Sequence, residues 1–235
     1  MFAGVDACKG GWIVAKSASW PCKEVPWLAV CPDFRAVLAL TQDCRRVAVD
    51  IPIGIPSGKQ LRLCDQEAKK FLSTNDHNHA AVFFTPPREC LTAKDAKAFQ
   101  LLHARARKTG AGYPVWGIVR KIKEADERMI PELQKTVIEF HPELAWLRNA
   151  RKNLSSKHTT EGISERKNVL RLLVPGLERL LRWNDFLGRA AAADDILDAL
   201  IGIGVARDSV RNSTYCLPAN TAEFDSKGLR MEMWY

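Results

Sequence analysis

The stretch that decides the fold is Phe2–Ala15, with the sequence FAGVDACKGGWIVA. Two apolar runs flank Lys9-Gly10-Gly11, and the glycines can adopt the positive φ angles that tight hairpin turns need, so the stretch predicts a β-hairpin. Asp6 lies inside the first run, among Phe, Ala, Val and Cys. A strand that is apolar on both faces is typical of the centre of a sheet, where an unpaired carboxylate costs several kcal/mol. Asp6 is therefore either a turn-forming residue at a strand end or a metal-binding or catalytic acid at the end of a central strand.

The segments that follow extend the hairpin into a sheet. The sequence predicts a third strand over Glu24–Cys31 and a helix over Phe34–Leu40. A buried strand that carries Asp50 is then predicted from Arg46 to Pro52, followed by a loop over residues 53–56. This order predicts an α/β fold with a mixed sheet, in which a three-strand meander is joined to parallel strands and the first strand is central. Asp6 and Asp50 then lie at equivalent ends of parallel neighbours, about 4.8 Å apart.

The middle of the chain has a different pattern. Residues 57–135 are predicted to form a mostly helical insertion within a single domain that spans 1–235. Sheet pattern returns at Thr136–Phe140, which carries Glu139, and a Pro-bearing turn is expected at residues 141–143. Ala190–Ala206, with the sequence AAAADDILDALIGIGVA, predicts a buried helix that nevertheless contains three aspartates.

The aspartates of this last helix point to metal chemistry. Asp195 and Asp198 are three residues apart and share a helix face, where like charges are mildly destabilising. A divalent cation reverses that effect, and Mg²⁺ prefers carboxylate oxygens. Two such ions about 4 Å apart can activate a water and stabilise the leaving oxygen in phosphodiester cleavage. The alternative for Asp194 is a charge that favours the start of the helix.

Four further residues are candidates with a structural alternative for each. Glu139 is either another catalytic acid or a structural one, and His141 is either a general acid or substrate contact, or a structural histidine. Arg88, next to two prolines, is either a phosphate contact or a surface arginine. Lys157 belongs to a basic segment that also includes residues 165–167, and it either follows a nucleic-acid backbone or lies on a solvated face.

Composition restricts the class of protein. The 235 residues carry a net charge of +8, and the positive excess lies in residues 57–135 and 148–189. A basic surface around an acidic site suits an enzyme that binds polyanions, although simple solubility also explains it. No apolar run reaches the ~18–20 residues of a membrane span, and no signal peptide is visible. The seven cysteines are dispersed and include no C-x-x-C, which favours a reducing compartment and a cytoplasmic protein.

Several ordered motifs carry a resemblance that extends over the chain: GVDACKGGW, VAVDIPIG, RLCDQEAKKFL, VFFTPPREC, WGIVRKI, IEFHPEL, DDILDAL and GLRMEMWY. Together they resemble an uncharacterised bacterial and archaeal family of predicted nucleases with an RNase H fold. The last helix is similar to that of RuvC-type junction resolvases, whose metal-binding pair corresponds to Asp195 and Asp198. The resemblance also implies that Asp6 is the first-strand acid and Asp50 the fourth-strand acid.

These observations lead to three hypotheses. The first is a Mg²⁺- or Mn²⁺-dependent nuclease that acts on DNA or RNA, in which Asp6, Asp50, Asp195 and Asp198 hold the metal. The second is a nucleotide-binding or phosphoryl-transfer protein on the same fold, although the phosphate loops of sugar kinases and actin-like ATPases are only partly matched. The third is a non-catalytic protein that binds nucleic acid.

Overall fold

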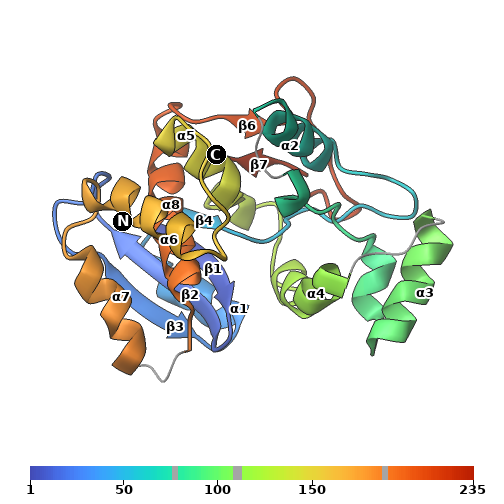
Figure 1. Ribbon diagram of the computed structural model, residues 1–235. Helices are drawn as coiled ribbons and strands as arrows, with labels where there is room; N and C mark the ends of the chain where they lie inside the picture. Colours follow the sequence, from blue (N-terminus) through green and yellow to red (C-terminus); the bar gives the residue numbers. More distant parts are fainter. Residues whose placement is uncertain (76–78, 108–112, 187–189) are drawn as a thin grey trace. The chain divides into compact units, whose positions relative to one another are not determined.

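The computed structural model describes residues 1–75, 79–107, 113–186 and 190–235 (Figure 1). The chain forms two compact units. The first comprises residues 1–50, 135–215 and 234–235, and the second comprises residues 51–134 and 216–233. The chain therefore leaves the first unit directly after Asp50 and returns to it shortly before β5.

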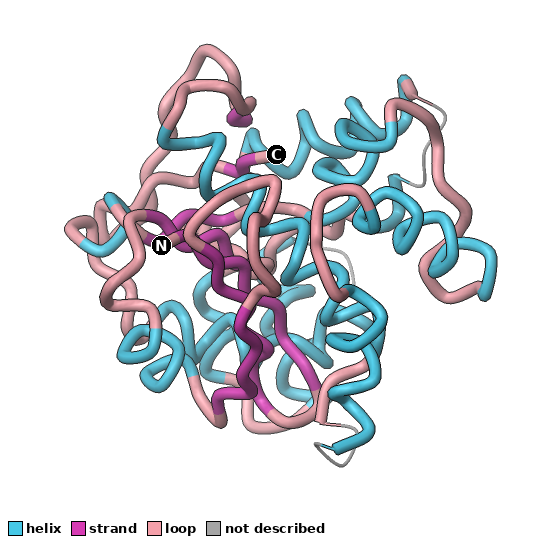
Figure 2. Tube along the Cα trace, turned by 90° about the vertical axis from the view of Figure 1, so that its left-hand side faces the viewer, coloured by secondary structure: helices cyan, strands magenta, loops and turns pink. Residues whose placement is uncertain are grey.

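The first unit contains a five-stranded mixed sheet, drawn in magenta in Figure 2. The strand order is β3-β2-β1-β4-β5, in which β1 to β3 are antiparallel and β1, β4 and β5 are parallel. The predicted mixed α/β sheet with a central first strand is thus confirmed. The strands are β1 (Phe2–Cys8), β2 (Gly11–Ser17), β3 (Trp27–Cys31), β4 (Arg46–Val49) and β5 (Val137–Glu139).

The fourth strand is shorter than the sequence predicts. It ends at Val49, and one further ladder bond runs from the Asp50 N–H to the Val5 carbonyl at 2.9 Å. Pro52 and Pro56 follow, and neither has an N–H to donate, so the apolar run continues as a loop. By contrast, helix α1 (Phe34–Leu40) has the predicted bounds, and the Asp33 side chain caps it by accepting from the Ala36 N–H at 2.8 Å.

Helix α8 (Ala193–Val210) packs against one face of the sheet, as Figure 1 shows. The contact is close because it is made of glycines. A Cβ on Gly4 of β1 would lie 2.0 Å from the Ala199 carbonyl oxygen, and a Cβ on Gly202 would lie 2.9 Å from the Phe140 ring. The opposite face of the sheet is covered by α1, where Phe34 packs on Trp12 with ring centroids 5.2 Å apart.

Three more helices complete the first unit: α5 (Pro142–Ala150), α6 (Thr160–Arg171) and α7 (Leu177–Phe186). Their apolar side chains join α8 and the sheet in one core. The expected turn at residues 141–143 is wrong, because helix α5 begins there. Pro142 occupies the first helical position, where its missing N–H costs nothing.

The second unit is mostly helical. It contains α2 (Leu63–Thr74), α3 (Ala96–Arg107), α4 (Tyr113–Asp126) and the short 3₁₀ segments η1 (His79–Ala81) and η2 (Arg88–Thr92). Another 3₁₀ segment, η3 (Leu133–Lys135), leads back toward β5, and two short strands, β6 (Cys216–Leu217) and β7 (Met233–Trp234), pair near the C-terminus. No helix within the described ranges has the length and apolar character to cross a membrane.

Candidate functional site

Two acids come together at the ends of the central parallel strands. Val5 of β1 pairs with Val49 of β4, so Asp6 and Asp50 are the next residues along each strand. Asp6 is two residues beyond Gly4, which touches α8, and alternation therefore turns the Asp6 side chain toward the same helix. Asp6 is 6% exposed and accepts from the Ala7 N–H at 2.6 Å, whereas Asp50 is half-buried.

Helix α8 brings two further acids to this end of the sheet. Asp198 is fully buried on the helix, one residue before Ala199, whose carbonyl lies against Gly4. Asp195, one turn earlier, is half-buried and accepts from the Ala192 N–H at 2.7 Å, which satisfies one of the free donors at the helix start. Asp194 also lies in this first turn, as the sequence predicts for a charge near the positive end of a helix.

A lysine ammonium lies among these carboxylates. Lys157, on the loop between α5 and α6, places its Nζ 2.8 Å from Asp198 Oδ2. The other carboxylate oxygen, Oδ1, accepts from the indole Nε1 of Trp146 at 2.6 Å. Both oxygens of the buried Asp198 side chain therefore have a donor, and one of the two donors is a cation.

The electrostatics show that the four acids share one environment. Burial, followed by the charges of Asp50 and Asp198, raises the pKa of Asp6 well above its ordinary value. Burial also raises the pKa of Asp50 to about 8 and that of Asp195 to about 6, in both cases against the opposing effect of Lys157. Burial raises the pKa of Asp198 as well, although Lys157 and Trp146 partly offset it. Burial therefore raises the pKa of all four carboxyl groups of the cluster.

The same charges act on Lys157 in the opposite direction. Burial alone lowers the pKa of its ammonium, but Asp198, Asp50 and Asp6 outweigh this effect and raise it. Three acids from β1, the end of β4 and α8 therefore attract one cation.

These residues have the chemistry that a divalent ion requires, but not yet the arrangement. Their donors are hard carboxylate oxygens, and the ammonium among them shows that the cluster attracts a cation. In the described part of the chain, however, no three His, Cys, Asp or Glu side chains are already gathered as a metal site. The ammonium of Lys157 lies instead against Asp198.

A buried ion pair that the sequence did not reveal packs against Trp146, the residue that binds Asp198. Arg166 of α6 is 1% exposed and donates to both oxygens of Glu143 at 2.9 Å. Its guanidinium carbon lies 5.8 Å from the centre of the Trp146 ring, so the arginine also packs on the indole that binds Asp198. For Arg166, this burial contradicts both alternatives that the sequence left open for residues 165–167, a contact with a nucleic-acid backbone and a solvated helix face. No local signal could have found the pair, because 23 residues separate its members.

Glu139 and His141, two further candidates from the sequence, lie at the end of β5 and at the start of α5. Phe140 meets Gly202 of α8, so alternation directs Glu139 toward the opposite face of the sheet. Glu139 is 3% exposed, and its charge contributes to the raised pKa of Asp50. His141 is half-buried at the N-terminus of α5, and its side chain makes no capping hydrogen bond there.

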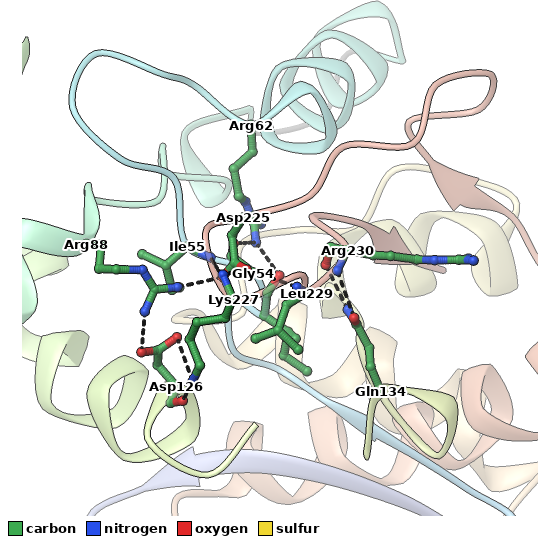
Figure 3. Close-up of polar contacts among 11 residues, drawn as sticks. Gly54, Ile55, Arg62, Arg88, Asp126, Gln134, Asp225, Lys227, Leu229 and Arg230 are labelled. Atoms are coloured by element: carbon green, nitrogen blue, oxygen red, sulfur yellow. Dashed lines mark hydrogen bonds and ion pairs between the residues drawn. The ribbon is translucent and has the colours of Figure 1, made fainter. Parts of the chain in front are cut away.

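Arg88 belongs to the second unit, where it joins a separate network (Figure 3). Its two terminal nitrogens bind Asp126 at 2.6 Å and Asp225 at 2.5 Å. The Asp225 carboxylate also accepts from the N–H groups of Ile55, Lys227 and Leu229. A phosphate at Arg88 would have to displace two carboxylates, so the geometry disfavours a phosphate contact. With a side chain 23% exposed and held by two ion pairs, Arg88 is not a free surface arginine either.

Residues 4–223 of the chain match a family described as a protein of unknown function, DUF429. The chain belongs to this family. Searches of curated proteins and of solved structures gave no match. The DUF429 match includes all four aspartates of the cluster, together with Lys157, Trp146 and the Glu143–Arg166 pair.

Proposed function

We propose that this DUF429 protein is a nuclease with an RNase H-like fold that uses Mg²⁺ or Mn²⁺ to hydrolyse phosphodiester bonds of nucleic acid. The observation that carries the proposal is the meeting of Asp6, Asp50 and Asp198 at one end of the central strands. Each is desolvated, and the charges of the three act on a common ammonium. Such a cluster is stabilised by cations and suits carboxylate-bound metal.

The topology of the sheet supports the proposed RNase H-like fold. A three-strand meander is joined through its central first strand to two parallel strands, which agrees with the resemblance to RNase H-fold proteins. The resemblance to RuvC-type resolvases also has a local counterpart, because Asp195 and Asp198 lie on the first turns of the helix that packs on β1.

The residues have separable roles in this proposal. Asp6, Asp50, Asp195 and Asp198 would hold the divalent ions, whose contribution when bound is to neutralise charge at a transferring phosphoryl group. Trp146 orients the Asp198 carboxylate, and Arg166 fixes the indole. Glu139 acts through its charge on Asp50 rather than from the α8 face of the sheet.

The proposed substrate is DNA or RNA, and the proposed location is the cytoplasm. In the first unit, Arg151, Arg179 and Arg182 are exposed and can approach a phosphate backbone. Arg171 and Lys152 are less available, because they pair with Glu178 and Glu165 at 2.9 and 2.7 Å. The dispersed cysteines are consistent with a reducing compartment.

A cleavage assay tests the proposal. Labelled single-stranded DNA, duplex DNA, junction DNA and RNA are incubated with the wild type in Mg²⁺, Mn²⁺ or EDTA, alongside Asp6→Asn and the control Asp43→Asn. Asp43 is an exposed acid that pairs with Lys16 away from the cluster. We expect metal-dependent cleavage by the wild type and the control, and its loss in Asp6→Asn. Cleavage that survives EDTA, or that Asp6→Asn retains, contradicts the proposal, as does the absence of cleavage on every substrate.

A further inference from the structure

The main chain before Lys157 is held by several hydrogen bonds, whereas its side chain is partly exposed. The backbone just before it is held by α6, because the Ser155 N–H binds Glu165 at 2.6 Å and the Ser155 carbonyl binds Arg166 at 2.8 Å. The next carbonyl, that of Ser156, accepts from the Thr159 hydroxyl at 2.8 Å. The loop therefore points Lys157 at Asp198 with little freedom in the main chain.

The side chain itself is held at one hydrogen bond and by the charges of three acids. Its ammonium has three donors, and among the described residues Asp198 is its single hydrogen-bond partner. The side chain is also 29% exposed, whereas the Arg166 side chain is 1% exposed and bound at four acceptors. The site thus contains one deeply buried cation next to Trp146 and one partly exposed cation that binds Asp198.

From this arrangement we propose that Lys157 is an exchangeable cation of the site, which leaves Asp198 when a divalent ion binds and then contacts a phosphate of the substrate. This inference rests on the proposed nuclease function. An ammonium and a divalent ion compete for the same carboxylate oxygen, Asp198 Oδ2, because they are drawn to it by the same negative charge. Once released, the ammonium lies on a pinned loop beside the acids, where a phosphate that shares the metal would come within its reach.

The exchange has a signature that a structural lysine would not produce. Removing Lys157 takes away a competitor of the metal and a partner of the phosphate. Metal affinity should therefore rise while nucleic-acid affinity falls. A lysine that only stabilised the fold would weaken both, or change neither.

The test uses the full-length protein and two ligands. Mn²⁺ affinity is obtained from the rise in melting temperature across a Mn²⁺ titration, and nucleic-acid affinity from fluorescence anisotropy of a labelled oligonucleotide in Ca²⁺. The variants are Lys157→Gln, the charge-retaining Lys157→Arg, and the control Lys152→Gln. Lys152 lies on the same loop, but it pairs with Glu165 and its side chain is 62% exposed.

We expect Lys157→Gln to bind Mn²⁺ several-fold more tightly than the wild type and the oligonucleotide several-fold more weakly. Lys157→Arg should stay near the wild type in both, and Lys152→Gln should leave Mn²⁺ affinity unchanged. Unchanged or weaker Mn²⁺ binding by Lys157→Gln, when the wild type does bind Mn²⁺, overturns the inference alone. If Mn²⁺ shifts neither protein, the nuclease proposal fails and the inference fails with it. Mn²⁺ binding by Lys157→Gln but not by the wild type also overturns the inference, because Lys157 then blocks the metal instead of leaving Asp198 when the metal binds.

Discussion

Replacing Arg166 by leucine tests how much the buried Glu143–Arg166 ion pair contributes to the stability of the fold. The arginine is buried and binds both oxygens of Glu143 at 2.9 Å, and its other terminal nitrogen binds the carbonyls of Ser155 and Gly162 at 2.8 and 3.1 Å. Removing one member of such a pair leaves the other buried and uncompensated, which costs about 3–5 kcal/mol. For a chain of 235 residues that loss lowers the melting temperature by roughly 6–20 °C.

Tryptophan fluorescence is a suitable probe, because six of the seven tryptophans lie in the first unit. Thermal and urea unfolding are compared for the wild type, Arg166→Leu, Glu143→Leu and the double variant. Since a hydrophobic replacement of a whole buried pair is often close to neutral, the double variant should be more stable than either single variant. If Arg166→Leu costs less than about 1 kcal/mol, or if the two single losses simply add, the pair does not support the site as argued.

Three further predictions concern other parts of the chain. Because burial raises the folded pKa of Asp50 to about 8, the folded state holds a proton that the unfolded chain loses above about pH 4, so stability should fall as pH rises between these values. We expect the free energy of unfolding, measured with urea in EDTA, to fall more between pH 5 and pH 7 for the wild type than for Asp50→Asn, by about 1–3 kcal/mol. Equal decreases in the two proteins contradict the raised pKa of Asp50. Gly4→Ala places a Cβ 2.0 Å from a backbone oxygen of α8 and should lower stability by about 1–3 kcal/mol in the same assay, so an unaffected variant is inconsistent with the close packing. Arg88→Leu breaks two ion pairs and should lower the melting temperature measured by circular dichroism without weakening oligonucleotide binding, whereas the reverse result would make Arg88 a phosphate contact.

The sheet could be predicted from sequence because its determinants are local. The glycine turn of the hairpin and the apolar runs on both sides of Asp6 indicate the order of the strands and the central place of the first. Helix α1 was predictable to its bounds because Asp33 caps it and Thr41 ends it. The strand before the second unit was predicted to reach Pro52 but ends at Val49. The prolines revealed the loop over residues 53–56, but the apolar run did not show where the last paired residue lies.

The interactions within the site depend on contacts far apart in sequence. Asp198 is separated from Trp146 by 52 positions in the sequence and from Lys157 by 41. Contacts at such separations produce no recognisable spacing pattern in the sequence. From the sequence, Arg166 was taken for part of a solvated basic segment. Sequence alone does not distinguish a buried arginine from an exposed one unless its partner is known. The helix that carries Glu143 and Trp146 was missed because its proline was taken for a turn.

The central claim is that the four aspartates form a site for divalent metal, and the most direct measurement is the melting temperature with and without Mn²⁺. At 100 times its dissociation constant, Mn²⁺ should stabilise the wild type by about 2.7 kcal/mol. Asp198→Asn should lose most of this gain, although its amide oxygen can still accept from the Trp146 indole. Asp194→Asn, in the first turn of the same helix, should keep it. No Mn²⁺ response in the wild type, or an undiminished response in Asp198→Asn, would contradict the claim.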